Sequence, residues 1–407
     1  MSSEWRVCTL GDFVRLQRGH DLTALEQKPG LVPVMGSAGP NGTHSEAKAT
    51  GPGVVIGRSG ASMGRVHLSE EDYWPHNTCI YVTDFLGNNP RFAYYLLGTL
   101  DLAAFNSGSA QPSLNRNFIY SIPLVVPDRV EQDRLVEILR AIDDRITLLR
   151  ETNTTLEAIA QALFKSWFVD FDPVRAKMEG RTPEGLDEAT AALFPDGFEE
   201  SALGLVPRGW RVGRVDDLGE VVCGKTPPTS VVENYGGDVP FITIPDMHNL
   251  LAVTSTVRSL SRLGADSQKK KYLPTGSICV SCIATPGLVV RVTTAAQTNQ
   301  QINSVVPHSK WGKAFPLFLL RRIGDAVRSN GSGGSVFHNL SKSGFERLPV
   351  LLTTSELAQH FDDAIEPMVM KSIENQEQAQ TLATLRDTLL PRLISGALRL
   401  PHSAEIK

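Results

Sequence analysis

Residues 135–167 of this 407-residue chain read LVEILRAIDDRITLLRETNTTLEAIAQALFKSW, and this stretch decides the fold. Apolar residues recur at alternating spacings of four and three, which is the pattern of a heptad repeat. The heptad positions are Leu135, Leu139, Ile142, Ile146, Leu149, Asn153, Leu156, Ala160, Leu163 and Trp167. A helix over residues 129–168 would be about 60 Å long. Such a helix is too long and too one-sided to be buried in a single globular domain.

A second heptad stretch lies near the C-terminal end of the chain. Its positions are Phe361, Ile365, Met368, Asn375, Ala379, Leu382, Leu389 and Leu393, with Ser372 and Arg386 as polar interruptions. Pro367 is expected to kink this helix or delay its start. Two such helices most simply pack on each other, and two equal halves favour an antiparallel arrangement about a pseudo-two-fold axis. Asn153 and Asn375 are then expected to pair near the crossing, because polar seam residues often set the register.

The two helical stretches belong to a longer internal repeat. Matched pairs, in chain order, are Trp5 with Trp210, Gly19 with Gly224, Gly53 with Gly276, Gly64 with Gly287, Asn77 with Asn299, Pro123 with Pro349, Leu156 with Leu382 and Leu163 with Leu389. Their order is preserved, and the offset grows by about 20 residues as expected from an insertion. The part of each repeat before its helix is rich in Gly, Pro, Asn and Ser, which predicts short strands and few helices.

The sequence therefore predicts an α+β protein with two pseudo-symmetric globular domains of mixed α/β structure. Each domain is followed by a long helix, and the two helices pack as an antiparallel coiled coil. The predicted boundaries are 1–127 for the first domain, 128–170 for the first helix, 171–208 for a linker, 209–353 for the second domain, 354–398 for the second helix and 399–407 for a C-terminal tail.

Composition narrows the class of protein. Hydrophobic residues make up 41% and charged residues 21%, as in ordinary globular proteins. No apolar run approaches the roughly 18 residues of a membrane span. Neither a secretion signal nor a disulfide framework is expected, and five cysteines favour a reducing compartment, hence the cytoplasm. The net charge is −4, but residues 1–127 carry −1, residues 128–172 carry −4 and residues 209–353 carry +7. Because local potential steers a polyanion, nucleic acid remains a candidate ligand.

Two short motifs resemble a nucleotide-binding loop and a redox or zinc site, but both are interpreted as parts of the structure without such a function. Gly219–Thr226 formally fits a phosphate-binding loop, but Pro227 and Pro228 prevent the helix that such a loop requires. Cys279 and Cys282 have redox or zinc spacing, yet residues three apart on a strand point to opposite faces. Buried structural cysteines are the expected outcome. No catalytic constellation or metal site is recognised, which favours a recognition or scaffold role.

Polar and basic residues on expected loops are candidates for DNA contact. In the first domain they are Arg58, Ser59, Asn77, Gln111, Asn115, Arg116 and Asn117. In the second they are Lys225, Lys269, Lys270, Lys271, Asn299, Gln300, Gln301, Asn339 and Lys342. Arg, Asn and Gln can read base edges, while Lys and Ser hold phosphates. For each residue taken singly, an ordinary solvated loop is the competing interpretation.

Several stretches resemble one known family. They include FKSWFVDFDP at residues 164–173, LRDTLLPRL at residues 385–393, and the segments 5–19, 57–60 and 298–303. The sequence resembles the specificity subunit of type I restriction–modification systems, and the resemblance covers nearly the whole chain.

The resemblance implies a fold and a division of labour. Each globular domain would be a target recognition domain that reads one half of a split double-stranded DNA sequence. The coiled coil would set the spacer and dock two modification subunits, which use S-adenosylmethionine to methylate adenine at N6. Restriction subunits that use ATP and Mg²⁺ would join the full complex. The chain itself would be non-catalytic, without cofactor, metal or membrane contact.

The residues expected in the coiled coil or at its partner contacts are Leu149, Asn153, Leu156, Leu163, Trp167, Phe168, Asn375, Leu382, Leu389 and Leu393. Three alternatives stay open. The same fold could serve a methylation-only defence system, which neighbouring genes would reveal. A scaffold without a DNA role would lack sequence-specific, salt-dependent DNA binding. A nucleotide hydrolase using Lys225 would lose ATP turnover when that lysine is replaced.

Overall fold

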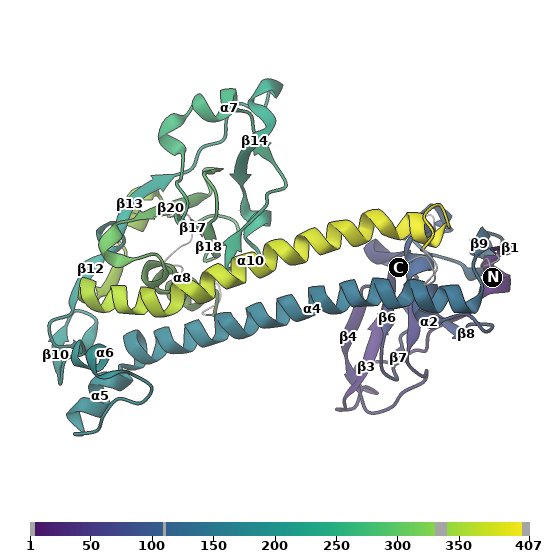
Figure 1. Cartoon of the computed structure of the whole chain (residues 1–407), viewed down its shortest axis with the longest axis horizontal. Helices are drawn as coiled ribbons and strands as arrows, with labels where there is room; N and C mark the ends of the chain where they lie inside the picture. The colour runs from purple at the N-terminus through teal and green to yellow at the C-terminus, as the bar shows by residue number, and fades with distance from the viewer. Residues whose placement is uncertain (1–4, 109–110, 330–339, 401–407) are drawn as a thin grey trace, which may run out of the picture. The chain divides into compact units, whose positions relative to one another are not determined.

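The computed structural model describes residues 5–108, 111–329 and 340–400. The chain divides into two compact units (Figure 1). Unit 1 consists of Met1–Ile146 and Gln380–Lys407, and unit 2 consists of Thr147–Ala379. Each unit therefore combines one globular domain with part of each long helix, and each is described by itself.

Unit 1 contains two sheets and a two-stranded ladder. The four-stranded sheet has the order β2 (Arg15–Arg18), β8 (Cys79–Asp84), β5 (Gly53–Gly57), β6 (Val66–Ser69), and the three-stranded sheet the order β4 (Gly39–His44), β3 (Val32–Gly36), β7 (Trp74–Pro75). β1 (Arg6–Thr9) pairs antiparallel with β9 (Pro123–Val126). Helix α2 (Pro90–Gly98) packs against β5 and β6. The Asn89 side chain caps it by accepting from the amides of Arg91 and Phe92. The short helices are α1 (Leu10–Phe13), η1 (Gly60–Ser62), η2 (Leu102–Phe105) and α3 (Arg116–Ile119).

Unit 2 repeats this plan. Its five-stranded sheet has the order β13 (Gly219–Cys223), β20 (Ile302–Pro307), β17 (Ile278–Ser281), β18 (Val289–Val292), β15 (Ala252–Val253), and its three-stranded sheet the order β16 (Ser259–Leu260), β14 (Tyr235–Ile242), β19 (Gln297–Thr298). β12 (Arg211–Arg214) pairs antiparallel with β21 (Pro349–Leu352). Helix α8 (Ala314–Ser329) packs on β17 and β18. The short helices are η4 (Val215–Asp217), η5 (Val232–Asn234), η6 (Ile244–Met247), α7 (Arg262–Asp266), η7 (Lys269–Lys271), η8 (Ser309–Trp311) and α9 (Lys342–Glu346).

The matched glycines show why the repeat is visible in the sequence. A Cβ at Gly19 would lie 2.0 Å from the His76 carbonyl oxygen, and a Cβ at Gly224 would lie 2.0 Å from that of Asn299. Only glycine allows this close approach of two backbones. The contacts also correct the sequence register by one residue, because the structural equivalent of Asn299 is His76 and not Asn77. The identical residues Asn77 and Asn299 therefore occupy neighbouring and not equivalent positions of the turn.

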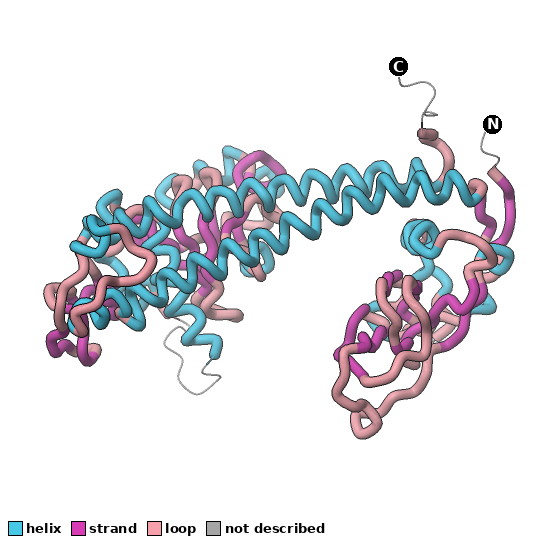
Figure 2. Tube along the Cα trace, turned by 60° about the horizontal axis from the view of Figure 1, so that its bottom comes forward, coloured by secondary structure: helices cyan, strands magenta, loops and turns pink. Residues whose placement is uncertain are grey.

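The two long helices are α4 (Arg129–Lys165), continued by a π-helical turn at Ser166–Asp170, and α10 (Ser355–Ile394). In each unit their segments run side by side in opposite directions (Figures 1 and 2). This confirms the predicted packing of the helices. The expectation that Pro367 delays the second helix is wrong, since α10 begins at Ser355. Pro367 is exposed while Ile365 and Val369 are buried, so the Asp363 carbonyl that loses its donor faces solvent.

The cores contain a helix and an aromatic residue that the sequence pattern does not reveal. Few helices were expected in the globular parts, and helix α8 contradicts that expectation. Its apolar run at residues 315–320 also fits a short buried strand, so the sequence pattern alone does not identify the helix. Phe164, which is outside the predicted heptad positions, packs on Phe168, Phe315, Phe318 and Phe361.

The segment expected to be a linker is also folded. It contains α5 (Asp172–Met178), α6 (Glu188–Ala192) and a hairpin of β10 (Phe198–Ser201) and β11 (Gly204–Pro207). Phe194, from this segment, packs edge-on against Trp167, with ring centroids 5.3 Å apart. Among the described helices, none is long and apolar enough to cross a membrane.

Candidate nucleic-acid interface

In the first domain, a turn at residues 76–78 connects β7 to β8 and lies against Gly19. The loop after β5 is attached to this turn, because the Arg58 amide donates to the Thr78 carbonyl (2.9 Å). The Arg58 guanidinium donates to the Asn77 carbonyl (3.4 Å). Three of the predicted residues, Arg58, Ser59 and Asn77, are therefore neighbours.

The segment before α3 joins the same surface. The Leu114 amide donates to the Arg58 carbonyl (2.8 Å), and Ser59 forms a β-bridge with Ser113. The structure thus brings Gln111, Asn115, Arg116 and Asn117 next to the Arg58 loop. Their roles differ, because Asn115 caps α3 through the Asn117 amide (3.0 Å), and the Arg116 guanidinium donates to the Leu16 carbonyl (2.8 Å). Gln111 and Asn117 have exposed side chains.

In the second domain, the equivalent turn is residues 299–301, between β19 and β20. The Lys225 amide donates to the Thr298 carbonyl (2.9 Å), and the Gln268 side chain donates to the Lys225 carbonyl (2.8 Å). These bonds bring Lys225, Asn299, Gln300 and Gln301 together and connect them to the segment of η7. Lys342 begins α9 and forms an ion pair with Glu346 (3.4 Å). Among the described residues, no hydrogen bond joins Lys342 to this turn. Asn339 lies outside the described residues.

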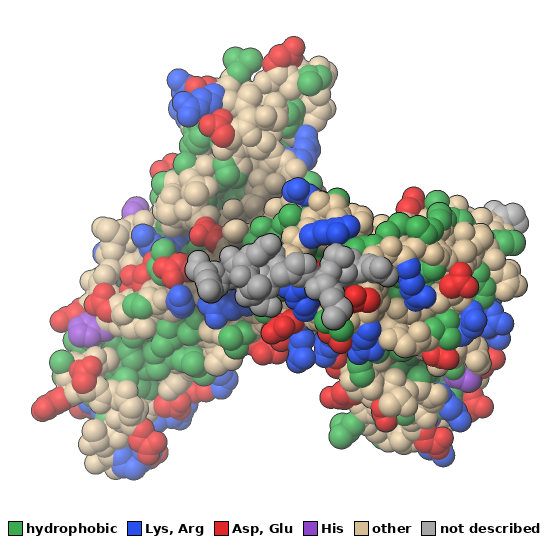
Figure 3. All heavy atoms as spheres, turned by 45° about the vertical axis from the view of Figure 1, so that its right-hand side comes forward, with side chains coloured by type: hydrophobic (Ala, Val, Ile, Leu, Met, Phe, Trp, Pro, Cys, Tyr) green, Lys and Arg blue, Asp and Glu red, His purple; other side chains and the backbone are tan. Residues whose placement is uncertain are grey.

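The three consecutive lysines form η7. Lys269 and Lys270 are exposed, and Lys271 is half-buried. Within the described part of the chain, no ion pair occupies any of the three. Figure 3 shows basic side chains interspersed with acidic ones at the top of the view. The η7 segment can attract phosphates.

The long helices carry the expected asparagine pair. Asn375 Nδ2 donates to Asn153 Oδ1 (2.9 Å), and Asn153 Nδ2 donates to the Ser372 carbonyl (2.8 Å). The polar seam residues of α4 and α10 thus satisfy one another. Of the other predicted helix residues, Leu149, Trp167, Phe168 and Leu393 are buried, and Leu156, Leu163, Leu382 and Leu389 are half-buried.

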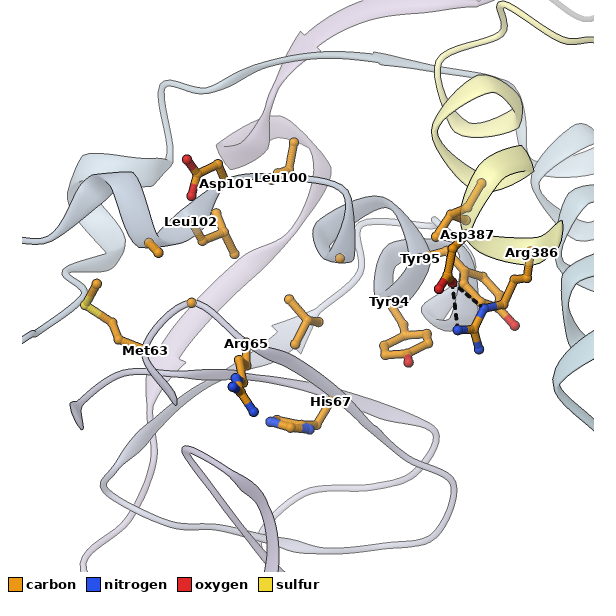
Figure 4. Close-up of a pocket in the computed structure, with 15 residues that line it drawn as sticks. Met63, Arg65, His67, Tyr94, Tyr95, Leu100, Asp101, Leu102, Arg386 and Asp387 are labelled. Carbon is orange, nitrogen blue, oxygen red and sulfur yellow. Dashed lines mark hydrogen bonds and ion pairs between the residues drawn. The ribbon is translucent and has the colours of Figure 1, made fainter. Parts of the chain in front are cut away.

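Arg386, the second polar interruption, lines a cavity of about 610 Å³ in unit 1 (Figure 4). The cavity lies between β6, α2, residues 100–103 and α10, and Arg65 and His67 line the wall facing Arg386. Arg386 pairs with Asp143 of α4 (2.6 Å) and with Asp387 (2.7 Å). The Tyr95 hydroxyl of α2 donates to Asp143 (2.5 Å), and burial followed by this bond raises the Tyr95 pKa. The network attaches the first domain to both long helices.

The cysteine motif is part of the hydrophobic core. Cys279 and Cys282 are buried in different core clusters, as predicted from their strand spacing. Burial raises the pKa of Cys279 to about 12 and that of Cys282 to about 11. Among the described residues, no group of three His, Cys, Asp or Glu side chains could hold a metal ion.

Gly219–Thr226 contains strand β13, and no helix begins between Gly224 and Val231. The geometry of a phosphate-binding loop is therefore missing from these described residues, as the two prolines predict.

Comparison with known proteins agrees with this architecture. The family model for the type I restriction modification DNA specificity domain matches residues 2–158 and 207–360. The type I restriction enzyme HindI specificity subunit of Haemophilus influenzae is 39% identical over 357 residues, which cover 76% of this chain and 77% of that protein. The MjaIX specificity subunit of Methanocaldococcus jannaschii is 24% identical over 359 residues, covering 85% and 78%.

A solved structure shows the same fold. The type I restriction–modification S subunit from M. genitalium superposes with a TM-score of 0.61 at 14% identity, over 98% of each chain. The family model matches most of the sequence, and the Haemophilus relative is similar over most of both chains. The chain belongs to the specificity subunits of type I restriction–modification systems, which are the non-catalytic DNA-specificity components of these enzymes.

Proposed function

We propose that this subunit reads a bipartite DNA target, with one half-site for each globular domain. The observation that carries the proposal is the repeated domain plan. The strand orders β2-β8-β5-β6 and β13-β20-β17-β18 correspond, and each sheet holds a polar turn against an equivalent glycine. Two domains of one design can read two short sequences, and helices of fixed length between them can set a fixed spacer.

The residues offered for this contact are those of the two polar turns and their neighbouring loops. These residues extend from loops and from the short helices α3 and η7 that adjoin them, and recognition residues concentrate in such connecting segments. They are Arg58, Gln111 and Asn117 in the first domain, and Lys225, Gln300 and the η7 lysines in the second. Arg116 and Asn115 contribute by holding the loop, since Arg116 donates to the Leu16 carbonyl and Asn115 accepts from the Asn117 amide. The proposed recognition domains are residues 1–127 and 209–353, with helices over 128–170 and 354–398 joined by residues 171–208.

The proposed partners are those that the family resemblance implies. Two modification subunits dock on the coiled coil and methylate adenine at N6 with S-adenosylmethionine. Restriction subunits that use ATP and Mg²⁺ join them, so the complex defends the cytoplasm against phage DNA. The same chain in a methylation-only system would lack the restriction subunits. The neighbouring genes distinguish the two cases.

A binding experiment tests the DNA-reading role. The chain is purified together with its modification subunits and used to select fragments from a random DNA library. We expect selected fragments to share a split sequence and to bind at least 10³-fold more tightly than scrambled DNA. Affinity should fall steeply with salt concentration.

Equal binding to selected and scrambled DNA, by a complex whose modification subunits bind S-adenosylmethionine, would contradict the proposal and favour a scaffold. ATP turnover by the purified chain that is lost in Lys225→Ala would instead support a hydrolase.

A further inference from the structure

The turns 76–78 and 299–301 share one arrangement of side-chain contacts. In each turn, the first and third residues interact: His76 Nδ1 lies 3.0 Å from Thr78 Oγ1, and Asn299 Nδ2 donates to Gln301 Oε1 (3.0 Å). The middle residue bonds to the side chain two positions after the matched glycine. Asn77 bonds to Asp21, and Gln300 bonds to Thr226. The two domains therefore place an amide side chain at an equivalent point.

The hydrogen bonds of the two middle residues have opposite polarity. Asn77 Nδ2 donates to the Asp21 carboxylate, whereas Gln300 Oε1 accepts from the Thr226 hydroxyl (2.7 Å). The bond from Asn77, more than any other contact, lowers the Asp21 pKa, so the carboxylate is ionised at neutral pH. An ionised carboxylate only accepts hydrogen bonds. Asn77 must therefore turn its N–H side toward Asp21, which leaves its carbonyl oxygen for another partner.

Other hydrogen bonds hold each turn, so the side-chain amides of Asn77 and Gln300 are not required to maintain its backbone. The Gly19 amide donates to the Cys79 carbonyl (3.0 Å), and the Gly224 amide donates to the Ile302 carbonyl (3.0 Å). These backbone bonds and the contact between first and third residues already fix each turn. Within the described chain, Asn77 Oδ1 and Gln300 Nε2 have no partner. Gln300 is exposed and Asn77 is half-buried. Lys225 lies beside the Gln300 turn and Arg58 lies beside Asn77, and both cations can attract phosphate.

We propose that Asn77 and Gln300 read base edges at equivalent positions of the two half-sites, and that Asp21 and Thr226 determine which kind of base each one reads. This inference rests on the proposed DNA-reading function. The free oxygen of Asn77 selects a base with an exocyclic amino group in the major groove, adenine or cytosine. The free N–H groups of Gln300 select a base whose major-groove edge carries acceptors and no amino group, guanine or thymine.

Thr226→Asp tests the inference by giving the second turn the polarity of the first. Gln300 must then turn its N–H side to the new carboxylate and expose its oxygen. The chain is expressed with its modification subunits in a host free of N6-methyladenine, and the methylated motif is mapped. We expect one base of one half-site to change from guanine or thymine to adenine or cytosine on the same strand. Asp21→Thr should change one base in the opposite half-site.

The matched control is Thr294→Asp. Thr294 is an exposed residue of the same domain, so this variant adds the same charge away from the turn and should leave the motif unchanged. Gln300→Ala should reduce the preference at the single affected position by about 10-fold or more.

An unchanged motif in Thr226→Asp, or an unchanged motif or a complete loss of methylation in Gln300→Ala, overturns the inference. If Thr226→Asp abolishes methylation, the result with Gln300→Ala decides whether Gln300 reads a base. Failure of the wild-type chain to give any split motif would instead contradict the proposed function.

Discussion

The two recognition domains share a backbone plan but are attached to the long helices by different side chains. The first domain uses Tyr95, Asp143 and Arg386, whose two charged members remain 29% and 28% exposed. The second uses a bidentate pair between Arg291 and Glu366 (2.6 and 2.7 Å), in which Arg291 is only 3% exposed. Arg321 additionally pairs with Glu157 of α4. The backbone contacts that require glycine occur in both domains, whereas the side chains that attach each domain to the long helices differ between them.

The largest effect is expected from the buried attachment of the second domain. Glu366→Ala leaves the Arg291 guanidinium uncompensated in the protein interior, which should lower the free energy of unfolding by about 3–5 kcal/mol. Urea unfolding of the chain, followed by tryptophan fluorescence, measures the change. Replacing both residues by apolar ones, Arg291→Met with Glu366→Leu, should recover most of the loss. A cost below about 1 kcal/mol for Glu366→Ala would show that the pair contributes little.

A smaller effect is expected from the exposed lysines of the second domain. Lys269, Lys270 and Lys271 have no ion-pair partner among the described residues, whereas the guanidiniums of Arg58 and Arg116 donate to backbone carbonyls. Changing the three lysines to Ala should lower the salt-dependence slope by up to about 2.7, equivalent to roughly 40-fold in affinity between 50 and 200 mM salt. DNA titrations at several salt concentrations measure this slope. Arg58→Ala with Arg116→Ala is the comparison, and an equal reduction in slope would refute the prediction.

The attachment of the first domain should matter less for stability than that of the second. Arg386→Ala removes bonds that are nearly one-third exposed, so solvent screening limits the expected loss in unfolding free energy to about 1–2 kcal/mol. Tyr95→Phe, which removes only the hydroxyl, should cost about 1 kcal/mol. The same urea unfolding experiment measures both. A loss larger than that of Glu366→Ala would reverse the proposed ranking of the two attachments.

The smallest effect is expected where the helices cross. Asn153→Leu combined with Asn375→Leu replaces a polar pair with apolar side chains, so the chain should become more stable by about 1 kcal/mol. The same change should loosen the helix register, which spin-label distances between α4 and α10 would report as a broader distribution. A purely destabilising result without broadening would contradict the role given to this pair.

The sequence predicted those features of the fold that follow from the spacing of apolar residues. The heptad positions predicted both long helices and the Asn153–Asn375 contact, and strand spacing predicted that Cys279 and Cys282 are buried. Helix α8 and the folded segment 171–208 were not predicted, because their burial comes from neighbours distant in sequence. The polarity of the Asn77 and Gln300 bonds depends on Asp21 and Thr226, and only the folded chain brings these side chains together.

The central claim is that two matched domains read two half-sites at a fixed separation. The most direct test is a genome-wide map of N6-methyladenine in the source cell, with and without this gene. We expect a split motif, two short half-sites with a constant spacer, that is methylated only when the gene is present. Identical maps, together with no split motif after co-expression with the neighbouring methyltransferase in a methylation-free host, would contradict it.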